Sequence, residues 1–365
     1  MQPKTIAILI PDLRAGGTEK VAVRLMRHFR AAGHKVELVL MQRAGELLAE
    51  IPDDVRIVDL AAPRVRNLIG PLVRYLRESK PDAIQARMWP LTVMAVIARR
   101  MARSKARLVV SDHSILSLHY AGKKKVLAAI ALTVRLFYPR ADARLAVATG
   151  TADDLARLSG IPRDRFDVIF NPVDKPPEGL KVPAEIECLW DGAKHRIIAV
   201  GTLKPEKNYV MLLRSFARLK AADSKLMIVG SGAQEAELKQ LAASLGIAER
   251  TCFPGYAVDT WPYYASSTLF VLSSDYEGYP NVLVEAMRSG LAVVSTDCES
   301  GPREILDGGR FGRLVPVGDE VALAEAIDAE LDRQHDPDLV RDRAEEISGA
   351  GTARRYLELL IGPAS

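Results

Sequence analysis

Two glutamates eight positions apart are the residues whose types and spacing best suit a polar ligand. Glu277 and Glu285 enclose the segment Gly-Tyr-Pro-Asn-Val-Leu-Val. Gly278 and Pro280 favour a loop at the first glutamate, whereas the second falls on a helix predicted over 282–289. The pair therefore cannot share one helical face, but it could accept hydrogen bonds from hydroxyl groups of one ligand lying at that helix N-terminus. Taken alone, the segment also fits a loop acid beside an unrelated helix glutamate.

A pair of lysines lies in a second loop, Gly201-Thr-Leu-Lys-Pro-Glu-Lys-Asn208. Lys204 and Lys207 sit between a predicted strand at 196–200 and a predicted helix at 209–221. An ammonium group together with the positive end of a helix could neutralise a diphosphate. A pair of solvated surface lysines explains the loop equally well.

Two glycine-containing turns could approach a phosphate. Arg14-Ala-Gly-Gly-Thr-Glu19 follows the first predicted strand, where Gly16 and Gly17 would let backbone amides come close to an anion, although a simple turn explains them as often. Val229-Gly-Ser-Gly-Ala-Gln-Glu235 has Glu235 where a dinucleotide fingerprint needs its third glycine. The second turn therefore argues against a nicotinamide or flavin enzyme.

Short β-branched runs alternate with amphipathic stretches along the chain, which is typical of parallel sheets with crossover helices. The predicted strands are 5–10, 35–41, 55–60, 83–85, 107–111, 144–147, 167–169, 196–200, 225–229, 269–272, 292–295 and 313–315, and the predicted helices include 18–32, 209–221, 233–245, 282–289 and 321–333.

This pattern predicts an α/β protein of two Rossmann-like, doubly wound domains facing a central cleft. The Pro- and Gly-rich stretch 171–179 is the expected linker between a first domain, residues 1–175, and a second domain, residues 176–349. A C-terminal helix at about 350–365 is expected to pack back on the first domain. Ligands of such sheets bind outside the carboxyl ends of the strands.

The net charge of +4 over 365 residues hides an asymmetry between the two halves. Residues 1–180 carry 30 Lys and Arg against 18 Asp and Glu, and residues 181–365 carry 20 against 28. A basic half points to an anionic partner, either phosphate-bearing lipid or nucleic acid, with scattered solvated charge as the alternative. No nucleic-acid motif or aromatic stacking array accompanies it, so we expect no nucleic-acid partner.

Basic segments at 64–80 and 122–140 are candidates for contact with an anionic membrane surface. The second begins with Lys123, Lys124 and Lys125 and continues with apolar residues at helical spacing, although a buried crossover helix fits it nearly as well.

No apolar run approaches the roughly 20 residues of a spanning helix. Three widely spaced cysteines fit a reducing compartment. We therefore expect a cytoplasmic protein that could associate with the inner face of the plasma membrane.

Several motifs together resemble the GT4 family of retaining glycosyltransferases with the GT-B fold, and the resemblance covers nearly the whole chain. They are Gly16-Gly-Thr-Glu19, Asp112-His113, Asn171-Pro-Val-Asp174, 201–208, Val229-Gly-Ser-Gly232, Phe253-Pro-Gly-Tyr256, 277–285 and Ser295-Thr-Asp-Cys-Glu-Ser-Gly-Pro-Arg-Glu304. The resemblance implies that Glu285 binds the ribose, Glu277 contacts donor-sugar hydroxyls and Lys207 holds the diphosphate. His113 would lie near the transferred sugar.

The resemblance also implies the rest of a donor site. Backbone amides at Asn281, Val282 and Leu283 would complete the phosphate cradle, and Tyr256 would lie in the base-binding loop. Thr202 replaces an arginine that many relatives carry, so one diphosphate cation is missing. Lys204 or Arg14 could substitute for it.

The acceptor or membrane side is assigned to Arg14, Arg87 and the three lysines at 123–125. No metal is expected, because the Asp336-Pro-Asp338 segment lies far along the chain from these loops and the family's mechanism needs none. No cofactor is expected besides the nucleotide-sugar substrate.

The sequence thus predicts a retaining glycosyltransferase that moves a hexose or N-acetylhexosamine from a UDP- or GDP-linked donor to a glycan or lipid-linked acceptor of cell-surface polysaccharide or glycolipid. Lysine and helix dipoles would stabilise the leaving nucleoside diphosphate, and the resemblance implies that its phosphate takes the acceptor proton. A sugar-nucleotide epimerase or a phosphorylase-like enzyme is the alternative, and a nucleic-acid-binding module is a more distant one.

Overall fold

The computed structural model describes residues 2–14 and 16–362. The chain forms two compact units, Met1–Val173 with Ser348–Ser365, and Asp174–Ile347. It passes from the first unit to the second after Val173, inside the predicted linker, and returns at Ser348. Ala15 of the first glycine-containing turn and residues 363–365 of the predicted C-terminal helix lie outside the described residues.

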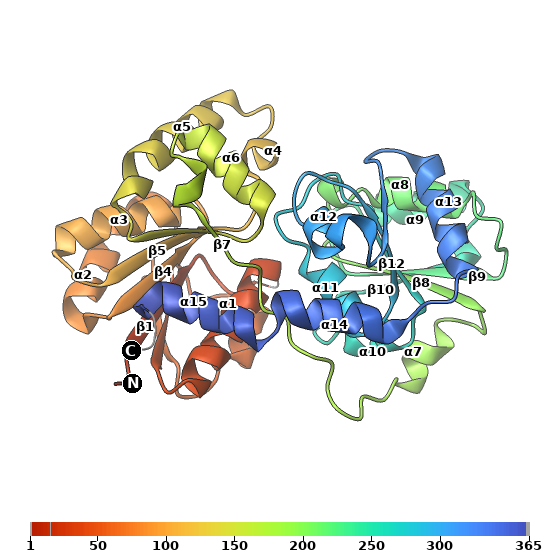
Figure 1. The fold of residues 1–365 in the computed structure, drawn as a ribbon, viewed down its shortest axis with the longest axis horizontal. Helices are drawn as coiled ribbons and strands as arrows, with labels where there is room; N and C mark the ends of the chain where they lie inside the picture. The colour runs from red at the N-terminus through yellow and green to blue at the C-terminus, as the bar shows by residue number, and fades with distance from the viewer. Residues whose placement is uncertain (1, 15, 363–365) are drawn as a thin grey trace. The chain divides into compact units, whose positions relative to one another are not determined.

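The first unit is built on a seven-stranded parallel sheet with the order β3-β2-β1-β4-β5-β6-β7 (Figure 1). Its strands are β1 (Thr5–Ile10), β2 (Lys35–Leu40), β3 (Arg56–Asp59), β4 (Ala83–Arg87), β5 (Arg107–Asp112), β6 (Ala143–Ala146) and β7 (Asp167–Val168). Its helices are α1 (Gly17–Ala31), α2 (Ile69–Ser79), α3 (Leu91–Ala102), α4 (Leu116–His119), α5 (Lys124–Phe137), α6 (Thr149–Ser159) and α15 (Ala350–Ile361).

Both faces of this sheet are buried, which explains why its strands are almost continuously apolar. Alternate residues of β1 enter two different cores. Ala7 and Leu9 pack with α2, α3, α5 and α6, whereas Ile6 and Ile8 pack with α1 and α15. Figure 1 shows α15, in blue, lying beside α1 although the two helices come from opposite ends of the chain.

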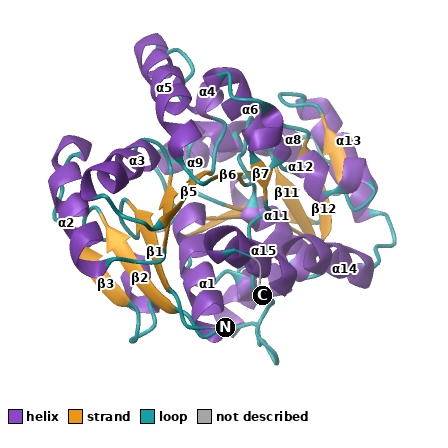
Figure 2. Ribbon diagram, turned by 60° about the vertical axis from the view of Figure 1, so that its left-hand side comes forward, coloured by secondary structure: helices purple, strands orange, loops and turns teal. Residues whose placement is uncertain are grey.

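The second unit is built on a six-stranded parallel sheet with the order β10-β9-β8-β11-β12-β13, again with helices packed against it (Figure 2). Its strands are β8 (His195–Val200), β9 (Ser224–Val229), β10 (Thr251–Gly255), β11 (Leu269–Leu272), β12 (Ala292–Thr296) and β13 (Arg313–Val315). Its helices are α7 (Ala184–Cys188), α8 (Tyr209–Phe216), α9 (Glu235–Ser244), α10 (Trp261–Ala265), α11 (Asn281–Arg288), α12 (Pro302–Ile305), α13 (Glu320–Leu331) and α14 (Pro337–Ser348).

The predicted fold class of two Rossmann-like α/β domains is confirmed, and each predicted strand is present within two residues of its expected ends. Strand β10 was not predicted. Helix α8 ends at Phe216 rather than at residue 221, because the chain must turn back before β9. Among the helices that the structure describes, none is both long and apolar enough to cross a bilayer.

Candidate functional site

Each sheet has one point where the strand order reverses, and the candidate residues gather there. In the second unit, β9 and β10 continue from β8 on one side, while β12 and β13 continue from β11 on the other. The loop after β8 carries Lys207, and the loop after β11 carries Glu277. In doubly wound sheets the ligand crevice opens outside the carboxyl ends of the two strands at such a point.

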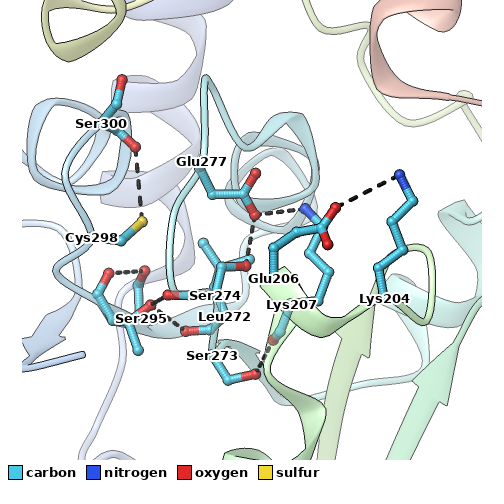
Figure 3. A network of polar contacts seen from close by, with 11 residues as sticks. Lys204, Glu206, Lys207, Leu272, Ser273, Ser274, Glu277, Ser295, Cys298 and Ser300 are labelled. Atoms are coloured by element: carbon cyan, nitrogen blue, oxygen red, sulfur yellow. Dashed lines mark hydrogen bonds and ion pairs between the residues drawn. The ribbon is translucent and has the colours of Figure 1, made fainter. Parts of the chain in front are cut away.

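Lys207 and Glu277 form an ion pair at this position. The Lys207 Nζ atom donates to Glu277 Oε1 at 2.6 Å, and the hydroxyl of Ser274 donates to the same oxygen at 2.7 Å. The side chains of Lys207 and Glu277 are 20% and 10% exposed. Figure 3 shows the two side chains pointing toward each other from the two loops. A partly exposed ammonium and carboxylate are thus held at the end of the sheet.

The two loops are fastened to each other by further polar contacts. The hydroxyl of Ser273 donates to the Lys207 carbonyl at 2.8 Å, and the Asp275 amide donates to the Glu206 carbonyl at 2.9 Å. Asn208 caps α8 by accepting from the Met211 amide at 3.1 Å, while its Nδ2 donates to Asp275 Oδ1 at 2.7 Å. The position of Lys207 is therefore set by both strands and by the start of α8.

The segment Val229-Gly-Ser-Gly232 packs against the 201–208 loop, which carries Lys204 and Lys207 and is called the lysine loop below. A Cβ atom at Gly232 would lie 2.4 Å from the Leu203 carbonyl oxygen, and one at Gly230 would lie 2.0 Å from the Gly201 carbonyl oxygen. The Leu203 amide donates to the Ser231 carbonyl at 2.9 Å across the same contact. The glycines therefore allow backbone to pack against backbone, which gives them a structural role without a dinucleotide.

Glu285 lies on α11 and is 6% exposed, whereas Glu277 precedes that helix in a loop. The hydroxyl of Tyr264 donates to Glu285 Oε2 at 3.2 Å and fixes the carboxylate. Helix α11 begins at Asn281, and the Leu283 amide already donates to the Pro280 carbonyl at 3.0 Å. Leu283 supplies one of the three amides that were predicted to bind the phosphate. To do so, this amide would have to share its proton between the Pro280 carbonyl and the phosphate, or give up its bond to Pro280.

Pro280 leads into α11 through a close backbone approach. Gly301 has φ of +93°, and a Cβ atom there would lie 2.4 Å from Pro280 Cδ. The hydroxyl of Ser300 donates to the Gly278 carbonyl at 2.8 Å, so the loop after β12 packs on the turn that contains Glu277. Cys298 lies in this loop, where burial and the Glu277 carboxylate raise its pKa to about 12 and keep it a neutral thiol.

The remaining donor-side candidates lie around the same loops. Lys204 is half-exposed and forms a 3.7 Å ion pair with Glu206, as Figure 3 shows. Thr202 accepts the Lys204 amide through its carbonyl at 2.9 Å. Tyr256 directly follows β10 with 42% of its surface exposed. Lys204 therefore stands in the same loop as Lys207 and is free to reorient, because its ion pair is long and solvent-exposed.

The first unit repeats the arrangement at its own reversal point, between β1 and β4. The loop after β1 contains Gly16, which is the N-cap of α1, and Gly17, which begins that helix. Arg87 is the last residue of β4, and its Nη2 donates to the Thr18 carbonyl at 3.3 Å. His113 follows β5, with Nδ1 3.5 Å from Arg87 Nη2 and Nε2 3.2 Å from the Ser111 hydroxyl. The glycine turn, the arginine and the histidine thus lie together.

Asp112 precedes this histidine and is buried in a separate network. Its carboxylate accepts from the Trp89 amide at 3.2 Å and from the Tyr138 hydroxyl at 2.5 Å, and Thr92 contacts the same hydroxyl at 2.8 Å. Burial raises the pKa of Asp112 to about 6, although both hydrogen bonds oppose that rise. Asp112 therefore fastens the loop after β4 to the end of α5.

The assignment of Arg87 to a membrane surface is wrong, and its assignment to the acceptor side stays a prediction. Its side chain has no exposed surface, and burial lowers its pKa to about 10. Arg14, in contrast, is exposed and forms a 3.3 Å ion pair with Asp12. Burial of an arginine could not be anticipated from the sequence, because this residue type is almost never fully buried without a partner.

The lysines at 123–125 are exposed, and Lys123 is the N-cap of α5. The apolar face that follows them is packed inside the unit, with Ile130 and Val134 buried against the core. The apolar face of α5 is therefore that of a buried crossover helix, as the alternative predicted, and contact of the exposed lysines with a membrane stays a prediction. The opposite face carries Leu132 and Leu136, which are 58% and 46% exposed.

The Asp336-Pro-Asp338 segment is the start of α14. Asp336 accepts from the Asp338 amide at 3.1 Å, and Asp338 pairs with Arg341 at 2.8 Å. Both aspartates therefore serve the helix terminus. Within residues 2–14 and 16–362, no group of three or more His, Cys, Asp or Glu side chains could hold a metal ion.

Residues that the sequence did not single out hold the candidates in place. Ser274 and Tyr264 fix the two glutamates, and Asn208 fixes the lysine loop. A signal existed only for Asn208, which stands directly before a helical pattern as an N-cap residue does. The serine and the tyrosine have no local motif, because their contacts depend on packing of distant segments.

Comparison with known proteins identifies the family of the chain. Residues 15–175 match the model of Glycosyltransferase Family 4, and residues 194–333 match that of Glycosyl transferases group 1. The Campylobacter jejuni N-acetylgalactosamine-N,N'-diacetylbacillosaminyl-diphospho-undecaprenol 4-alpha-N-acetylgalactosaminyltransferase is 28% identical over 98% of this chain and 99% of its own. The lipopolysaccharide 1,6-galactosyltransferase of Salmonella typhimurium is 31% identical over 54% of this chain and 55% of its own.

Solved structures share the fold over nearly the whole chain. Anabaena HepE, crystallised with UDP and glucose, superposes with a TM-score of 0.81 at 21% identity and covers 97% of this chain and 98% of its own. The fold and the sequence matches define a glycosyltransferase with two Rossmann-like domains, the GT-B fold. The chain belongs to the glycosyltransferases that join a Family 4 N-terminal domain to a group 1 C-terminal domain.

Proposed function

We propose that the protein transfers a hexose or N-acetylhexosamine, with retention at the anomeric carbon, from a UDP- or GDP-linked donor to a lipid-linked or lipopolysaccharide-type glycan. The observation that carries the proposal is the Lys207–Glu277 pair at the reversal point of the second sheet. An ammonium and a carboxylate there offer one group for a diphosphate and one for sugar hydroxyls. Glu285 then binds the ribose, and Tyr256 contacts the base.

Donor binding changes the partner of Lys207. A diphosphate carries more charge than a carboxylate and competes for the ammonium that Glu277 holds at 2.6 Å. Once Lys207 turns to the diphosphate, Glu277 keeps the Ser274 hydroxyl and gains free lone pairs for donor-sugar hydroxyls. The pair thus couples diphosphate capture to exposure of the sugar-binding carboxylate.

Bond cleavage in this proposal relies on electrostatic stabilisation of the departing nucleoside diphosphate by Lys207, by Lys204 and by the N-terminus of α11. The leaving phosphate takes the acceptor proton on the same face, which gives retention. No metal takes part in this proposal. Dialysis against EDTA followed by assay tests that point, and we expect unchanged turnover.

The acceptor class is suggested by the relatives. The Campylobacter and Salmonella enzymes are named for transfer to an undecaprenyl-diphosphate-linked glycan and to lipopolysaccharide. An acceptor of this kind is held at a membrane surface, which fits the basic first half of the chain. We propose that the protein acts in the cytoplasm, on the inner face of the plasma membrane.

The charge of the first unit supports a membrane-facing surface around α5. Residues 83–141 contain eleven Lys and Arg and a single acid, Asp112, which is buried. The outer face of α5 has the Lys123–Lys125 triplet at its start and exposed leucines further along. Near its end, Arg100, Arg103 and Arg140 line a groove of about 730 Å³. Basic residues beside exposed apolar ones favour an anionic lipid interface.

The test is transfer itself. The protein is incubated with UDP- and GDP-sugars and an undecaprenyl-diphosphate-linked glycan, and the anomeric proton of the product is followed by NMR. We expect an α-linked product from an α-linked donor. An isomerised sugar nucleotide without transfer would support the epimerase alternative, and a β-linked product would contradict retention.

A further inference from the structure

Arg87 is a fully buried cation whose charge the proposed donor chemistry does not use. Its three described partners are the Thr18 carbonyl at 3.3 Å, the Gln85 Oε1 at 3.4 Å and the His113 Nδ1 at 3.5 Å. None of these is a carboxylate, and its Nε is buried with no hydrogen-bond partner. A buried guanidinium without an ion pair costs several kcal/mol, so a structural reason alone would favour an apolar residue here.

The partners of Arg87 decide the protonation of His113. An arginine can only donate, so Nδ1 of the histidine must accept, and the neutral ring must carry its proton on Nε2. That nitrogen lies 3.2 Å from the Ser111 hydroxyl oxygen. The other tautomer would set the Nδ1 proton against the protons of the guanidinium.

The hydrogen bonds around Ser111 also indicate that His113 donates through Nε2. The Ser111 hydroxyl donates to the Ala86 carbonyl at 3.4 Å, which leaves its oxygen to accept from His113. Gln85 donates to the same oxygen through Nε2 at 3.4 Å and accepts from Arg87 through Oε1. Each donor in this chain therefore meets an acceptor only if the histidine is an Nε2–H imidazole.

We propose that Arg87 is a positioning residue for sugar transfer, which holds His113 as a neutral imidazole with Nε2–H as its only donor. The inference rests on the proposed function for the role of His113 beside the transferred sugar. A sugar hydroxyl can take over the Nε2–H bond that Ser111 accepts in this structure, whereas an imidazolium would add a second positive charge beside a sugar that itself becomes positively charged as its bond to the diphosphate breaks.

The charged and titratable groups around Arg87 and His113 favour a neutral imidazole ring at His113. Burial, and then the charge of Arg87, lower the pKa of His113 well below its usual value. Glu19 of α1 and Tyr356 of α15 act on the Arg87 guanidinium. The Asp112 carboxylate is engaged by Trp89 and Tyr138.

The test begins with the wild-type protein, labelled with ¹⁵N at histidine. Long-range ¹H–¹⁵N spectra distinguish the two neutral tautomers from the cation, and His113→Gln assigns the signal. We expect an Nε2–H signal for His113 that persists below the pH at which an ordinary histidine becomes charged, since burial and the charge of Arg87 lower its pKa. An Nδ1–H signal, or a ring that becomes cationic at the pH of an ordinary histidine, would overturn the proposal without any arginine variant and without any assay of transfer.

Variants then connect the tautomer with turnover. Arg87→Met removes the charge and the donor, so the pKa of His113 should rise toward its usual value, and the acid limb of the kcat profile should move to higher pH. We expect kcat to fall roughly tenfold to a hundredfold, with a smaller change in the donor KM, as for a misplaced catalytic group. Arg87→Lys keeps a cation and a donor and should recover part of both.

Arg144→Met is the matched control. Arg144 also donates to backbone carbonyls of the first unit, those of Tyr138, Ala141 and Arg165, but it makes none of the contacts to His113. Its loss should lower Tm and leave the His113 signal and the acid limb unchanged. If Arg87→Met kept the wild-type tautomer and acid limb, Arg87 would be a structural residue only. Absence of transfer in every protein, with an Nε2–H signal intact, would count against the proposed function instead.

Discussion

The two glutamates of the second unit differ in what holds them, and this difference supports different roles. Glu277 lies in a loop and accepts hydrogen bonds from Lys207 and Ser274, whereas Glu285 lies on helix α11 and accepts one from Tyr264. The lysine can change partner, since a diphosphate attracts it more strongly than a carboxylate does. In the proposed function, Glu277 therefore responds to the donor, and Glu285 is a preformed acceptor of hydroxyl hydrogen bonds.

Substitution of these glutamates should separate binding from turnover. Glu285→Ala should weaken affinity for the free nucleoside diphosphate by roughly tenfold or more, because hydrogen bonds to a charged group are worth about 1.5–3 kcal/mol. Glu277→Ala should leave that affinity nearly unchanged, or raise it by releasing Lys207, and should chiefly lower kcat. Calorimetric titration with UDP and GDP measures the first effect, and initial rates measure the second. An equal loss of nucleotide affinity in both variants would contradict the assigned roles.

At the scale of elements, the apolar periodicity was enough to predict the alternation of strands and helices, because both sheets are buried on both faces. Strand β10 was missed because Thr251-Cys-Phe-Pro-Gly255 contains proline and glycine, which the edge position tolerates. Lys207 and Glu277 come together because of the order of the strands in the second sheet, which cannot be read from the sequence. The burial of Arg87 is likewise a property of the packed fold.

The backbone contact behind the lysine loop gives a prediction at this scale. Gly232→Ala places a methyl group 2.4 Å from the Leu203 carbonyl oxygen, so the 201–208 loop must shift. We expect a loss of about 1–3 kcal/mol in the free energy of unfolding, together with weaker binding of nucleoside diphosphate. Chemical denaturation and calorimetry measure the two effects.

Gly351→Ala is the control for that substitution, because a Cβ atom at Gly351 meets nothing within 4 Å and the residue lies in α15. It should leave nucleotide affinity unchanged and stability equal or slightly higher. A Gly232→Ala protein with wild-type affinity and stability would show that the close approach does not position the lysine loop.

For the whole molecule, the charge imbalance between the two halves predicts that the basic first half contacts an anionic surface. Lys123, Lys124 and Lys125 changed together to Glu should reduce co-sedimentation with vesicles that contain anionic lipid, since each basic residue near such a surface contributes ~1 kcal/mol. Neutral vesicles should retain little protein in either case, and the binding should weaken with salt. The melting temperature should be unchanged, because the three side chains are exposed.

The control carries the same change of charge on the second unit. Lys181, Lys194 and Lys220 are exposed, and their joint replacement by Glu should leave vesicle binding nearly as in the wild type. If both triple variants lost binding equally, net charge rather than the α5 surface would be responsible. If the wild-type protein ignored lipid charge at low salt, the membrane-facing proposal would be withdrawn.

The central claim is that Lys207 holds the diphosphate of a nucleotide-sugar donor, and a calorimetric comparison of diphosphate with monophosphate tests it most directly. The wild-type protein is titrated with UDP and UMP, and with GDP and GMP, and Lys207→Ala is titrated in parallel. For the matching base, we expect the wild-type protein to prefer the diphosphate by roughly tenfold or more, and Lys207→Ala to lose most of that preference while its monophosphate affinity is kept. An undiminished preference for the diphosphate in Lys207→Ala, or no binding of either nucleoside diphosphate by the wild-type protein, would contradict the account.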